Sequence, residues 1–403
     1  MAGRQTGPLT SVKVIELTHV MAGPVCGLML ADMGADVIKV ERVPGGDTSR
    51  EDLAYTIDGE SAAFMMMNRN KRGISVDLKS EGGQRVLHRL LEDADVILEN
   101  YRTGTMDRLG FGYETLHPRY PRLIYCAVSG FGRSGPYAER GGFDLVAQGM
   151  SGLMSITGEA PGRPPVKVGA PVTDIGAGFL AAMGICAALH HRERTGQGQM
   201  VDTSLFDAGV TFTYWQSAIA FAAQQASEPM GSAHPLSAPY EAFETSDGWI
   251  TLGAANQTNW QRVTEVLDAR HLAQDSRFED NAGRLKHRFA LAEALNAIFR
   301  TKPTAEWLER LEAAGVPAGP ILDVLEMQRD PHTLARKLVV EVTHSRAGQV
   351  ETLGIPVKFS ETPGGPQFGA PVYGEHTREI LAEHGFSEAE IKALIEGAAV
   401  AAG

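Results

Sequence analysis

VKVIELTHVMAGPVCGLMLADMGADVIKVE, residues 12–41, is the stretch that decides the fold. Residues 12–17 are mostly apolar and β-branched, which predicts a buried parallel strand. Val25–Met33 has the apolar spacing of a helix, with Pro24 in its first turn and Gly34 at its end. Asp36–Glu41 predicts a second strand. Strand, helix and strand within about 30 residues form a βαβ unit, which implies a parallel sheet with a right-handed crossover.

The alternation of strand and helix continues to about residue 209. We expect, in order, a helix, a strand, a short helix, a strand, a long helix, and a final strand with its helix, at residues 82–93, 96–99, around Met106, 123–128, 174–191 and 199–209. Helices that connect parallel strands cover both faces of their sheet. The fold class predicted for residues 1–209 is therefore α/β, a doubly wound parallel sheet that forms a large domain.

A second unit follows a break in this pattern. Residues 210–238 lack a clear period and are predicted to be a linker. Residues 239–325 predict a smaller α+β domain, with a hairpin at 240–252 that turns at Asp247–Gly248 and helices near 259–267, 288–299 and 304–314. Residues 326–403 are expected to be a linker and a C-terminal part that returns to the large domain, with strands at 338–343 and 350–359 before a helical tail.

The composition limits the classes of function. The 403 residues include 37 basic and 49 acidic ones, and a net charge of −12 argues against a nucleic-acid partner, which requires a broad positive surface. The longest apolar run, Gly176–Leu189, is shorter than the roughly 20 residues that cross a bilayer, so no membrane partner is expected. Cys26, Cys126 and Cys186 have neither metal-site spacing nor a disulfide pattern, and no secretory signal is evident. We expect a cytoplasmic protein with no metal site.

The turn after the first strand, Thr18–Pro24, lies where nucleotide-binding folds hold phosphate groups. It contains a single glycine, whereas close approach to a dinucleotide requires the G-x-G-x-x-G pattern. Glu41, at the end of the second strand, matches the acidic residue that binds ribose in such sites. An NAD-dependent oxidoreductase therefore stays as an alternative that rests on the fold alone.

Basic residues follow the ends of several predicted strands. Arg42 follows the second strand, Lys71 and Arg72 lie in NRNKRG, and Arg108 lies beyond the fourth strand. Ligands in open α/β sheets bind outside the carboxyl ends of the strands, so these cations are candidates for binding one anion. Each of them is equally explained as a solvated surface charge.

Asp174 lies in GAPVTDIGAG, directly before the long helix of small residues. An aspartate at this position is usually an N-cap that accepts a backbone hydrogen bond. Gly176 and Gly178 favour a nucleophile, because they leave room for a ligand at a cost of about 1 kcal/mol each in helix propensity relative to alanine. A helix N-terminus would also keep the carboxylate ionised, as a nucleophile requires. Both roles stay open at this point.

A loop in the second unit is another candidate for chemistry. LGAANQ, residues 252–257, has one glycine and two alanines, which leave the main chain with little side-chain cover. Such a loop can present N–H groups to an oxyanion or shield an intermediate from water, and it can equally be a tight turn. The sequence has no G-x-S-x-G motif and no cysteine with an evident partner histidine, which argues against a serine or cysteine acyl enzyme.

Six segments follow one another in the chain as VIELTHVMAGPVCGLMLADMGADVIKVERVPGGD, NRNKRGISVDLKS, ADVILENYRTGTMDRLG, GFDLVAQGMSG, PVTDIGAG and TGQGQMVDTSLFD. Together they resemble the class III CoA-transferase family, the group that contains formyl-CoA transferase and carnitine CoA-transferase. The resemblance implies an acyl-CoA:carboxylate CoA-transferase that uses coenzyme A and acyl-CoA as substrates and binds no permanent cofactor. It also implies a homodimer of two interlocked, ring-shaped chains.

The resemblance also assigns roles to particular residues. Asp174 matches the catalytic aspartate of the family, and the mobile loop of the family falls on Gly253, Ala254, Ala255, Asn256 and Gln257. The residues implied to line the CoA site are Val20, Met21, Ala22, Arg42, Asn70, Lys71, Asn100, Tyr101 and Arg108.

The mechanism that follows begins with attack of Asp174 on the donor thioester, which gives a mixed anhydride and then an aspartyl-CoA thioester. We expect succinyl-CoA as the donor and a short dicarboxylic acid as the acceptor, because the polar Gln148 and the backbone-rich loop would suit a small polar acid. The resulting prediction is a CoA-transferase that works through a covalent intermediate.

The same superfamily contains a 2-methylacyl-CoA racemase, which is a second alternative. A racemase needs two bases, one on each face of the α-carbon, and its motif places a histidine before an aspartate. This chain has Gly142-Phe143-Asp144 instead. A phenylalanine cannot exchange a proton, so the residues favour the transferase.

Overall fold

The computed structural model of the chain describes residues 6–51 and 53–403. The chain divides into two compact units. Unit 1 comprises Met1–Leu153, Lys167–Ser217 and Pro331–Gly403, and unit 2 comprises Met154–Val166 and Ala218–Asp330. Unit 1 is thus assembled from three separate parts of the sequence.

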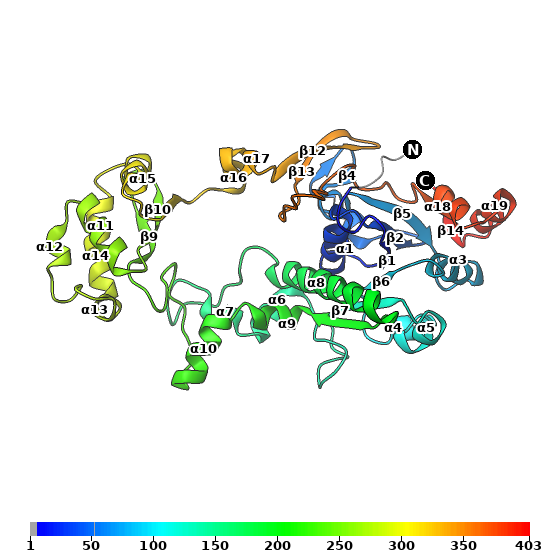
Figure 1. The fold of residues 1–403 in the computed structure, drawn as a ribbon, viewed down its shortest axis with the longest axis horizontal. Helices are drawn as coiled ribbons and strands as arrows, with labels where there is room; N and C mark the ends of the chain where they lie inside the picture. The colour runs from blue at the N-terminus through cyan, green and yellow to red at the C-terminus, as the bar shows by residue number, and fades with distance from the viewer. Residues whose placement is uncertain (1–5, 52) are drawn as a thin grey trace. The chain divides into compact units, whose positions relative to one another are not determined.

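Unit 1 is built on a seven-stranded sheet with the order β14-β5-β2-β1-β6-β7-β8 (Figure 1). All neighbours are parallel except β14, which is antiparallel to β5. The chain moves outward from β1 to one side and then to the other, so the predicted parallel α/β sheet is confirmed. The strands are β1 Lys13–Leu17, β2 Asp36–Arg42, β5 Lys71–Val76, β6 Val96–Glu99, β7 Ile124–Ser129, β8 Met200–Ser204 and β14 Val400–Ala401.

Both faces of this sheet are covered by helices. Successive side chains of a strand point to opposite faces, so Val14 and Ile15 belong to different cores. The core with Val14 is closed by α1 (Ala22–Asp32), α8 (Val172–Thr195) and α9 (Leu205–Thr211). The core with Ile15 is closed by α3 (Glu81–Leu91), α5 (Tyr113–Arg119), α18 (Thr377–Glu383) and α19 (Glu388–Glu396). Burial on both faces explains why the strands read as continuous apolar runs.

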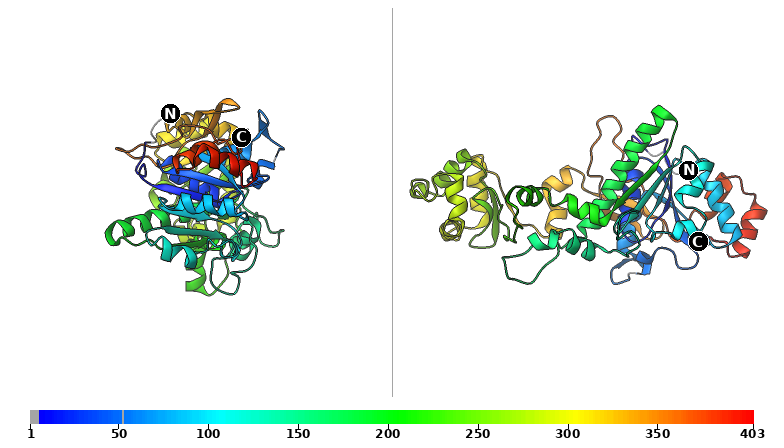
Figure 2. Two further views of the ribbon diagram at one scale, coloured as in Figure 1. Left: turned by 90° about the vertical axis from the view of Figure 1, so that its right-hand side faces the viewer. Right: turned by 90° about the horizontal axis from the view of Figure 1, so that it is seen from below.

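The C-terminal part of the chain belongs to unit 1, where α18 and α19 lie beside the N-terminal strands (Figure 2). Before them, β12 (Val339–His344) and β13 (Gly348–Leu353) form an antiparallel hairpin. Residues 354–359 were expected to extend the second of these strands, and they do not. Pro356 lies in that segment, and a proline cannot donate a ladder hydrogen bond.

Helix α8 is the one helix among the described residues that is long and apolar enough to cross a membrane by length and composition, but half of its apolar window is buried in the protein. Its buried side chains, Ala181 and Ile185 among them, belong to the core with Val14. The interior position of α8 therefore accounts for its apolar composition, since a helix in a protein core can be as long and as apolar as one that crosses a membrane.

Unit 2 has a three-stranded antiparallel sheet in the order β11-β10-β9. The predicted hairpin is confirmed as β9 (Tyr240–Glu244) and β10 (Trp249–Gly253), and β11 is Ala318–Pro320. Trp260, Phe299 and Trp307 fill the core between sheet and helices. The helices are α11 Gln257–Val266, α12 Arg270–Ala273, α13 Asn281–Lys286, α14 Arg288–Phe299 and α15 Thr304–Ala313.

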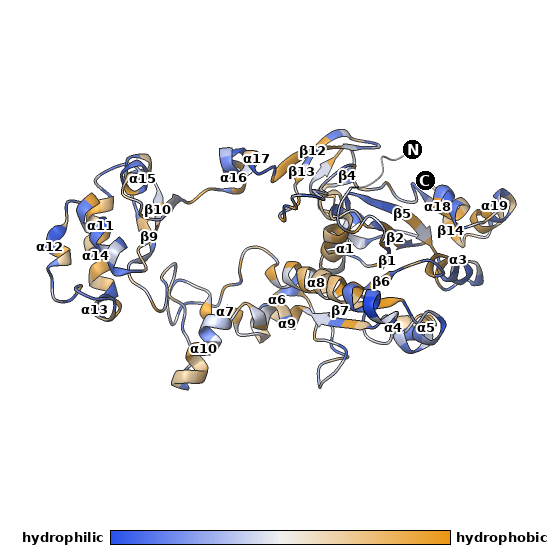
Figure 3. Cartoon of the chain, in the orientation of Figure 1, coloured by the Kyte–Doolittle hydropathy of each residue, from blue (hydrophilic) through white to orange (hydrophobic). Residues whose placement is uncertain are grey.

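Residues 210–238, expected to be a linker without regular structure, contain α10, Tyr214–Ala223. None of its residues is buried, and Tyr214 and Phe221 are 73% and 80% exposed. Figure 3 shows most of this helix on the hydrophobic side of the scale. Its apolar residues lie all around the helix and do not form one stripe, so its sequence lacks the period that predicts an amphipathic helix.

The remaining elements connect these layers. They are the 3₁₀ turn η1 Thr48–Glu51, β3 Thr56–Ile57, β4 Glu60–Ser61, α2 Ala62–Asn68, α4 Thr105–Arg108, α6 Asp144–Met150, α7 Leu153–Ile156, α16 Val324–Arg329 and α17 Pro331–Ala335.

Candidate active site

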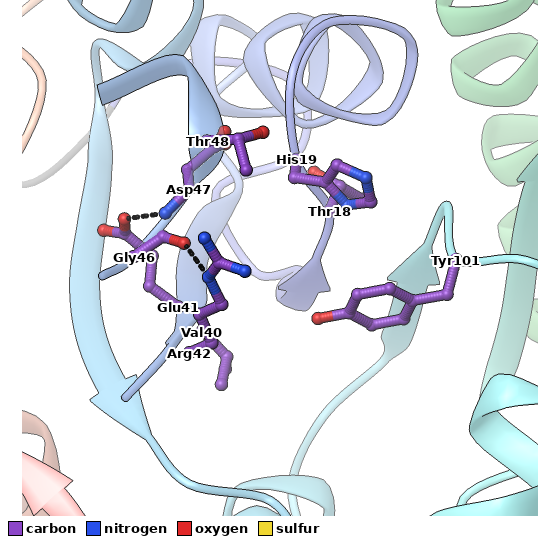
Figure 4. A pocket seen from close by; sticks show the side chains of 9 residues that line it. All are labelled: Thr18, His19, Val40, Glu41, Arg42, Gly46, Asp47, Thr48 and Tyr101. Atoms are coloured by element: carbon purple, nitrogen blue, oxygen red, sulfur yellow. Dashed lines mark hydrogen bonds between the residues drawn. The ribbon is translucent and has the colours of Figure 1, made fainter. Parts of the chain in front are cut away.

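A pocket of about 120 Å³ opens at the carboxyl edge of the unit 1 sheet (Figure 4). Three adjacent strands supply its walls, with His19 after β1, Arg42 at the end of β2 and Tyr101 after β6. Ligands of open α/β sheets bind at this edge. Of the predicted CoA-site residues, Arg42 and Tyr101 line the pocket. The other lining residues are Thr18, Val40, Glu41, Gly46, Asp47 and Thr48.

The turn after β1 is held in place by hydrogen bonds to two other segments. The side chain of Asn100 donates to the carbonyl of His19 at 2.9 Å and accepts from its N–H at 3.0 Å. Oδ1 of Asp47 accepts from the N–H of Val20 at 3.0 Å. Val20 has a φ of 65°, a conformation that a β-branched residue adopts only when its surroundings enforce it. Asn100 therefore shapes the pocket, and Met21 and Ala22 follow as the start of α1.

Two rings and a guanidinium group line part of the pocket. The rings of His19 and Tyr101 are 5.6 Å apart between centroids, and Figure 4 shows Tyr101 extending toward Arg42. Burial lowers the pKa of His19, so its imidazole is neutral at pH 7. Nε of Arg42 donates to the carbonyl of Gly46 at 2.9 Å, and its exposed ion pair with Glu51 is worth little. Arg42 can therefore exchange that partner for a ligand.

A buried cluster of charges supports the floor of the pocket. Nζ of Lys39 lies 2.9 Å from Asp47 and 3.2 Å from Glu16, and all three side chains are buried. Burial alone would raise the pKa of Asp47. Lys39 and the hydrogen bonds from Val20 and Ser49 outweigh burial and hold this pKa well below its usual range. Asp47 is thus a fixed anion that anchors the turn.

Lys71 and Asn70, predicted to line the CoA site, do not reach this pocket. Lys71 begins β5 and therefore lies at the amino edge of the sheet, whereas Arg42 pairs with the end of β5. Its fully buried Nζ lies 2.8 Å from Glu16 and donates to the carbonyl of Pro24 at 2.9 Å. The buried side chain of Asn70 donates to Asp32 and accepts from the N–H groups of Gln367 and Phe368. NRNKRG precedes a strand, and the sequence interpretation placed it after one.

The exposed cations at the carboxyl edge only partly match the prediction. Arg108 in α4 is exposed, and its guanidinium donates to Thr105. Arg72 is at the amino edge of β5, where it pairs with Asp36 at 2.8 Å. Lys79 was missed, although it follows β5 as Arg42 ends β2. It is exposed, and its Nζ forms no hydrogen bond or ion pair with any described residue. The rule that selected Arg42 would have found Lys79 if the bounds of β5 had been predicted correctly.

Asp174 lies inside the first turn of α8, which begins at Val172, and the expected N-cap role is wrong. The N-cap position is Pro171, which makes no side-chain cap hydrogen bond. Asp144, the first residue of α6, takes this role from outside, because its Oδ1 accepts from the N–H and the hydroxyl of Thr173 at 3.0 and 2.7 Å. The carboxylate of Asp174 forms no hydrogen bond or ion pair with a residue that the structure describes.

The expectation that the helix N-terminus keeps Asp174 fully ionised at neutral pH is also wrong. Burial, together with the negative charge of Asp144, raises the pKa of Asp174 to about 7. These two effects outweigh the favourable dipole of α8. Asp174 is therefore poised between acid and anion near neutral pH, which is typical of a reactive group.

Gly176 and Gly178 serve helix packing and do not leave room for a ligand. A Cβ on Gly176 would lie 2.7 Å from the ring of Phe212, and one on Gly178 would lie 2.7 Å from the carbonyl oxygen of Ala22. Residues four apart share one face of a helix, so the face of α8 that carries Asp174 packs on the first turn of α1. Asp174 is thus within about one helical turn, 5.4 Å along α8, of the segment that follows the pocket.

Gln148, expected to contact a small acid, is fully buried and bonded at both ends. Its Nε2 donates to Oδ2 of Asp144 at 2.7 Å, and its Oε1 accepts from the N–H of Val168 at 2.9 Å. The amide therefore supports Asp144 and has no free group for a substrate.

The loop from Gly253 to Gln257 connects β10 and α11 in unit 2. The N–H groups of Gly253 and Ala254 donate to the carbonyls of Pro317 and Pro239, so neither is available to an oxyanion. Asn256 caps α11 by accepting from the N–H of Asn259 at 2.8 Å. Gln257 accepts from Arg284 at 3.0 Å, and Ala255 is exposed. The structure of unit 2 thus shows a well-bonded turn.

Comparison with known proteins gives consistent matches along the whole chain. A model of CoA-transferase family III matches residues 9–377. The succinyl-CoA:glutarate CoA-transferase of Mus musculus is 36% identical over 376 residues, which cover 93% of this chain and 86% of that protein. The succinyl-CoA:mesaconate CoA-transferase of Haloarcula hispanica is 38% identical over 391 residues, covering 94% and 97% of the two chains.

A solved structure gives the same result for the fold. The crystal structure of a CaiB/BaiF family protein from Brucella suis matches with a TM-score of 0.84 and 38% identity, covering 94% of this chain and 100% of that one.

Proposed function

This chain belongs to CoA-transferase family III, and we propose that it moves coenzyme A from succinyl-CoA to a short dicarboxylic acid through Asp174. Relatives aligned over more than nine tenths of the chain are CoA-transferases. The chain is accordingly an acyl-CoA:carboxylate CoA-transferase. The identity of the nucleophile, the site of coenzyme A and the choice of acids are the proposed parts.

The observation that carries the role of Asp174 is its half-buried carboxyl group, which has no hydrogen-bond or ion-pair partner among residues 6–51 and 53–403. A carboxylate whose hydrogen bonds are not taken up within the fold is available to a ligand, whereas a structural aspartate is bonded to neighbouring residues. Its raised pKa makes the anion more basic and therefore a better nucleophile, while about half of the molecules still hold that anion at pH 7. A purely structural aspartate would instead have taken the cap that Asp144 provides.

The proposed reaction has four acyl transfers. The Asp174 carboxylate attacks the donor acyl carbonyl, and the coenzyme A thiolate leaves, giving an aspartyl–acyl anhydride. The thiolate then attacks the aspartyl carbonyl of the anhydride, which releases the donor acid and leaves an aspartyl-CoA thioester. The acceptor carboxylate attacks this thioester and expels the thiolate again. The thiolate finally attacks the acceptor acyl group of the new anhydride and restores Asp174.

Coenzyme A is assigned to the pocket at the carboxyl edge of the sheet. Tyr101 offers a flat ring and Arg42 a flat cation, both suited to a purine base or a phosphate. Lys79 and Arg108 add exposed positive charge at the same edge. A chain with a net charge of −12 needs a local group of cations to bind a polyanion, and these residues provide one.

The proposed acids rest on the relatives. The aligned enzymes are named for succinyl-CoA and for glutarate or mesaconate, so a four- or five-carbon dicarboxylate is the acceptor class that we propose. The earlier argument from Gln148 does not contribute, because that side chain has no free hydrogen-bonding group.

We extend the proposal to a cytoplasmic homodimer with interlocked chains. Helix α10 has no fully buried residue, and Trp215 and Phe221 are 60% and 80% exposed. This supports a partner chain, because large exposed apolar surfaces mark interfaces. Cys26, Cys126 and Cys186 are free, which suits a reducing compartment.

The two alternatives lack support from the site. Phe143 is 74% exposed and carries no proton to exchange, and the neighbouring Asp144 is already bonded to Thr173 and Gln148. The turn after β1 has no glycine before Gly23, where a dinucleotide site would need one.

A panel of acyl-CoA donors and acid acceptors, read by mass spectrometry, tests the proposed function. Succinyl-CoA with glutarate or mesaconate should give the new thioester and free succinate. A 2-methylacyl-CoA in deuterated water should gain no deuterium. Deuterium exchange without transfer would favour the racemase, and a change in nicotinamide absorbance would favour the oxidoreductase.

A further inference from the structure

The side chains of Thr173, Asp144 and Gln148 form a chain of hydrogen bonds at the start of α8, which is called the relay below. Asp144 receives both hydrogen bonds from Thr173, at 3.0 Å from the N–H and 2.7 Å from the hydroxyl. Its second oxygen accepts from Gln148 at 2.7 Å, and Gln148 accepts from the N–H of Val168 at 2.9 Å. The relay thus joins α6, the segment before α8 and the first turn of α8.

The relay leaves the carboxylate of Asp174 without a capping role. A helix leaves its first four N–H groups without partners, and an acidic residue in the first turn normally satisfies one of them. Because Asp144 bonds the N–H of Thr173, the carboxylate of Asp174 is not used as a cap. Gln148 is fully buried and holds the side chain of Asp144 in place, so the fold itself keeps Asp144 as the cap and Asp174 without a capping role.

We propose that Asp144 is a positioning residue for the transferase reaction, because it takes over the N-terminal hydrogen bonds of α8 and so leaves the carboxylate of Asp174 free to attack the thioester. Asp144 touches no reacting atom and acts on Asp174 in two ways, through its hydrogen bonds from Thr173 and through its negative charge. The inference rests on the proposed function, in which Asp174 is the nucleophile.

The charge of Asp144 has a second effect on the same neighbour. Burial and this charge are the two causes that raise the pKa of Asp174. Acidic groups on the other elements that pack against α8 have partners of their own. They are Asp32 of α1 with Arg69, Asp202 of β8 with the N–H of Arg133, and Asp207 of α9 with Ser204. After burial, Asp144 is therefore the second cause of the raised pKa of Asp174, and it is the acidic group that contributes.

The test compares the pH dependence of kcat/KM in wild type, Asp144→Asn and Asp207→Asn. Asp144→Asn keeps an oxygen that accepts from Thr173 but removes the charge. Its acid limb should move down from about 7 and stay above the ordinary aspartate value, because burial still raises the pKa of Asp174, and activity at pH 9 should be lower because the nucleophile is less basic. Asp207→Asn, on another helix packed against α8, should keep the wild-type limb.

An Asp144→Asn enzyme whose activity falls equally at every pH, with an unmoved acid limb, would overturn the inference, since a merely structural role predicts that result. Retained transfer at pH 9 would show that the proposed function still holds in that case. Loss of transfer in Asp174→Asn tests the proposed function separately.

If Asp144→Asn does not fold by circular dichroism, the double variant Asp144→Asn/Gln148→Glu replaces it. The new amide can accept from Thr173 and donate to the new carboxylate, which accepts from the N–H of Val168. All hydrogen bonds of the relay are then satisfied, and residue 144 itself carries no charge. Its acid limb should lie below that of wild type, and coincidence of the two limbs would contradict the inference.

Discussion

Gly178 of α8 lies against Ala22 of α1 so closely that a Cβ on Gly178 would be 2.7 Å from the carbonyl oxygen of Ala22. No side chain fits between two backbones at this distance. The contact holds the second turn of α8, one turn after Asp174, beside the first turn of α1, which follows the pocket at the sheet edge. A glycine at this position thus allows the close approach of the two helices next to the reactive group.

Gly178→Ala should destabilise the protein and lower its activity. Alanine gains about 1 kcal/mol in helix propensity, but overpacking against a backbone costs about 1–3 kcal/mol, so the clash should prevail. Urea denaturation should show the loss, with Gly169→Ala as the control, because nothing lies within 4 Å of a Cβ at that glycine. Equal stability of the two variants would contradict the close approach of the helices.

The activity of the wild-type enzyme should fall as the pH drops below 7. The raised pKa of Asp174, about 7, means that the carboxyl group is increasingly protonated below that pH, and the neutral acid is no nucleophile. A plot of kcat/KM from pH 5.5 to 9 should therefore show an acid limb with a midpoint near 7. A flat profile between pH 5.5 and 8 would indicate an aspartate with an ordinary pKa.

Arg42→Ala should weaken the binding of coenzyme A roughly tenfold or more, because a hydrogen bond to a charged group contributes about 1.5–3 kcal/mol. Calorimetry with coenzyme A measures the loss, which should shrink at high salt. Arg89→Ala removes an exposed cation of α3 and serves as the control. If both variants bind like wild type, coenzyme A does not use the pocket at the sheet edge.

Lys71→Met should lower stability and leave the affinity of the folded protein for coenzyme A unchanged. The buried ammonium lies 2.8 Å from Glu16 and donates to Pro24, and removal of one partner of a buried ion pair costs about 3–5 kcal/mol. Chemical denaturation and calorimetry on the same sample separate the two effects. Wild-type stability with lost affinity would return Lys71 to the CoA site.

Much of unit 1 could be predicted from the sequence because its strands are buried on both faces. Burial explains the apolar runs of β1 and β2, and backbone conformation explains Pro24 and Gly34 at the two ends of the helix between them. Both can be recognised from the local sequence. Helix α10 could not be found in this way. Its exposed apolar residues follow no stripe, and nothing local distinguishes such a segment from a loop.

The site was only partly predictable for a different reason. The sequence places Asp174 at the start of a helix, but the cap that frees it comes from Asp144, 30 residues earlier. Lys71 is a second case, since its charge suggested a phosphate contact and the fold buries it against Glu16. Both errors concern tertiary partners, which no local pattern contains.

The ionised carboxylate of Asp174 should also lower the stability of the folded protein. The pKa of Asp174 is raised in the folded state, so holding the anion there costs stability as the pH rises from the unfolded value of about 3.8 through about 7. Asp174→Asn removes this cost. Above pH 7 the variant should therefore be at least as stable as wild type, and below pH 4 the difference should vanish.

The central claim is tested most directly by the transferase activity of Asp174→Asn, measured with succinyl-CoA and glutarate on protein shown to be folded. An amide cannot form the anhydride, so we expect almost no transfer. Hydroxylamine added with acyl-CoA should modify the peptide that contains Asp174 in wild type and leave that peptide unmodified in the variant. Transfer at a rate near that of wild type by the folded Asp174→Asn protein would contradict the mechanism.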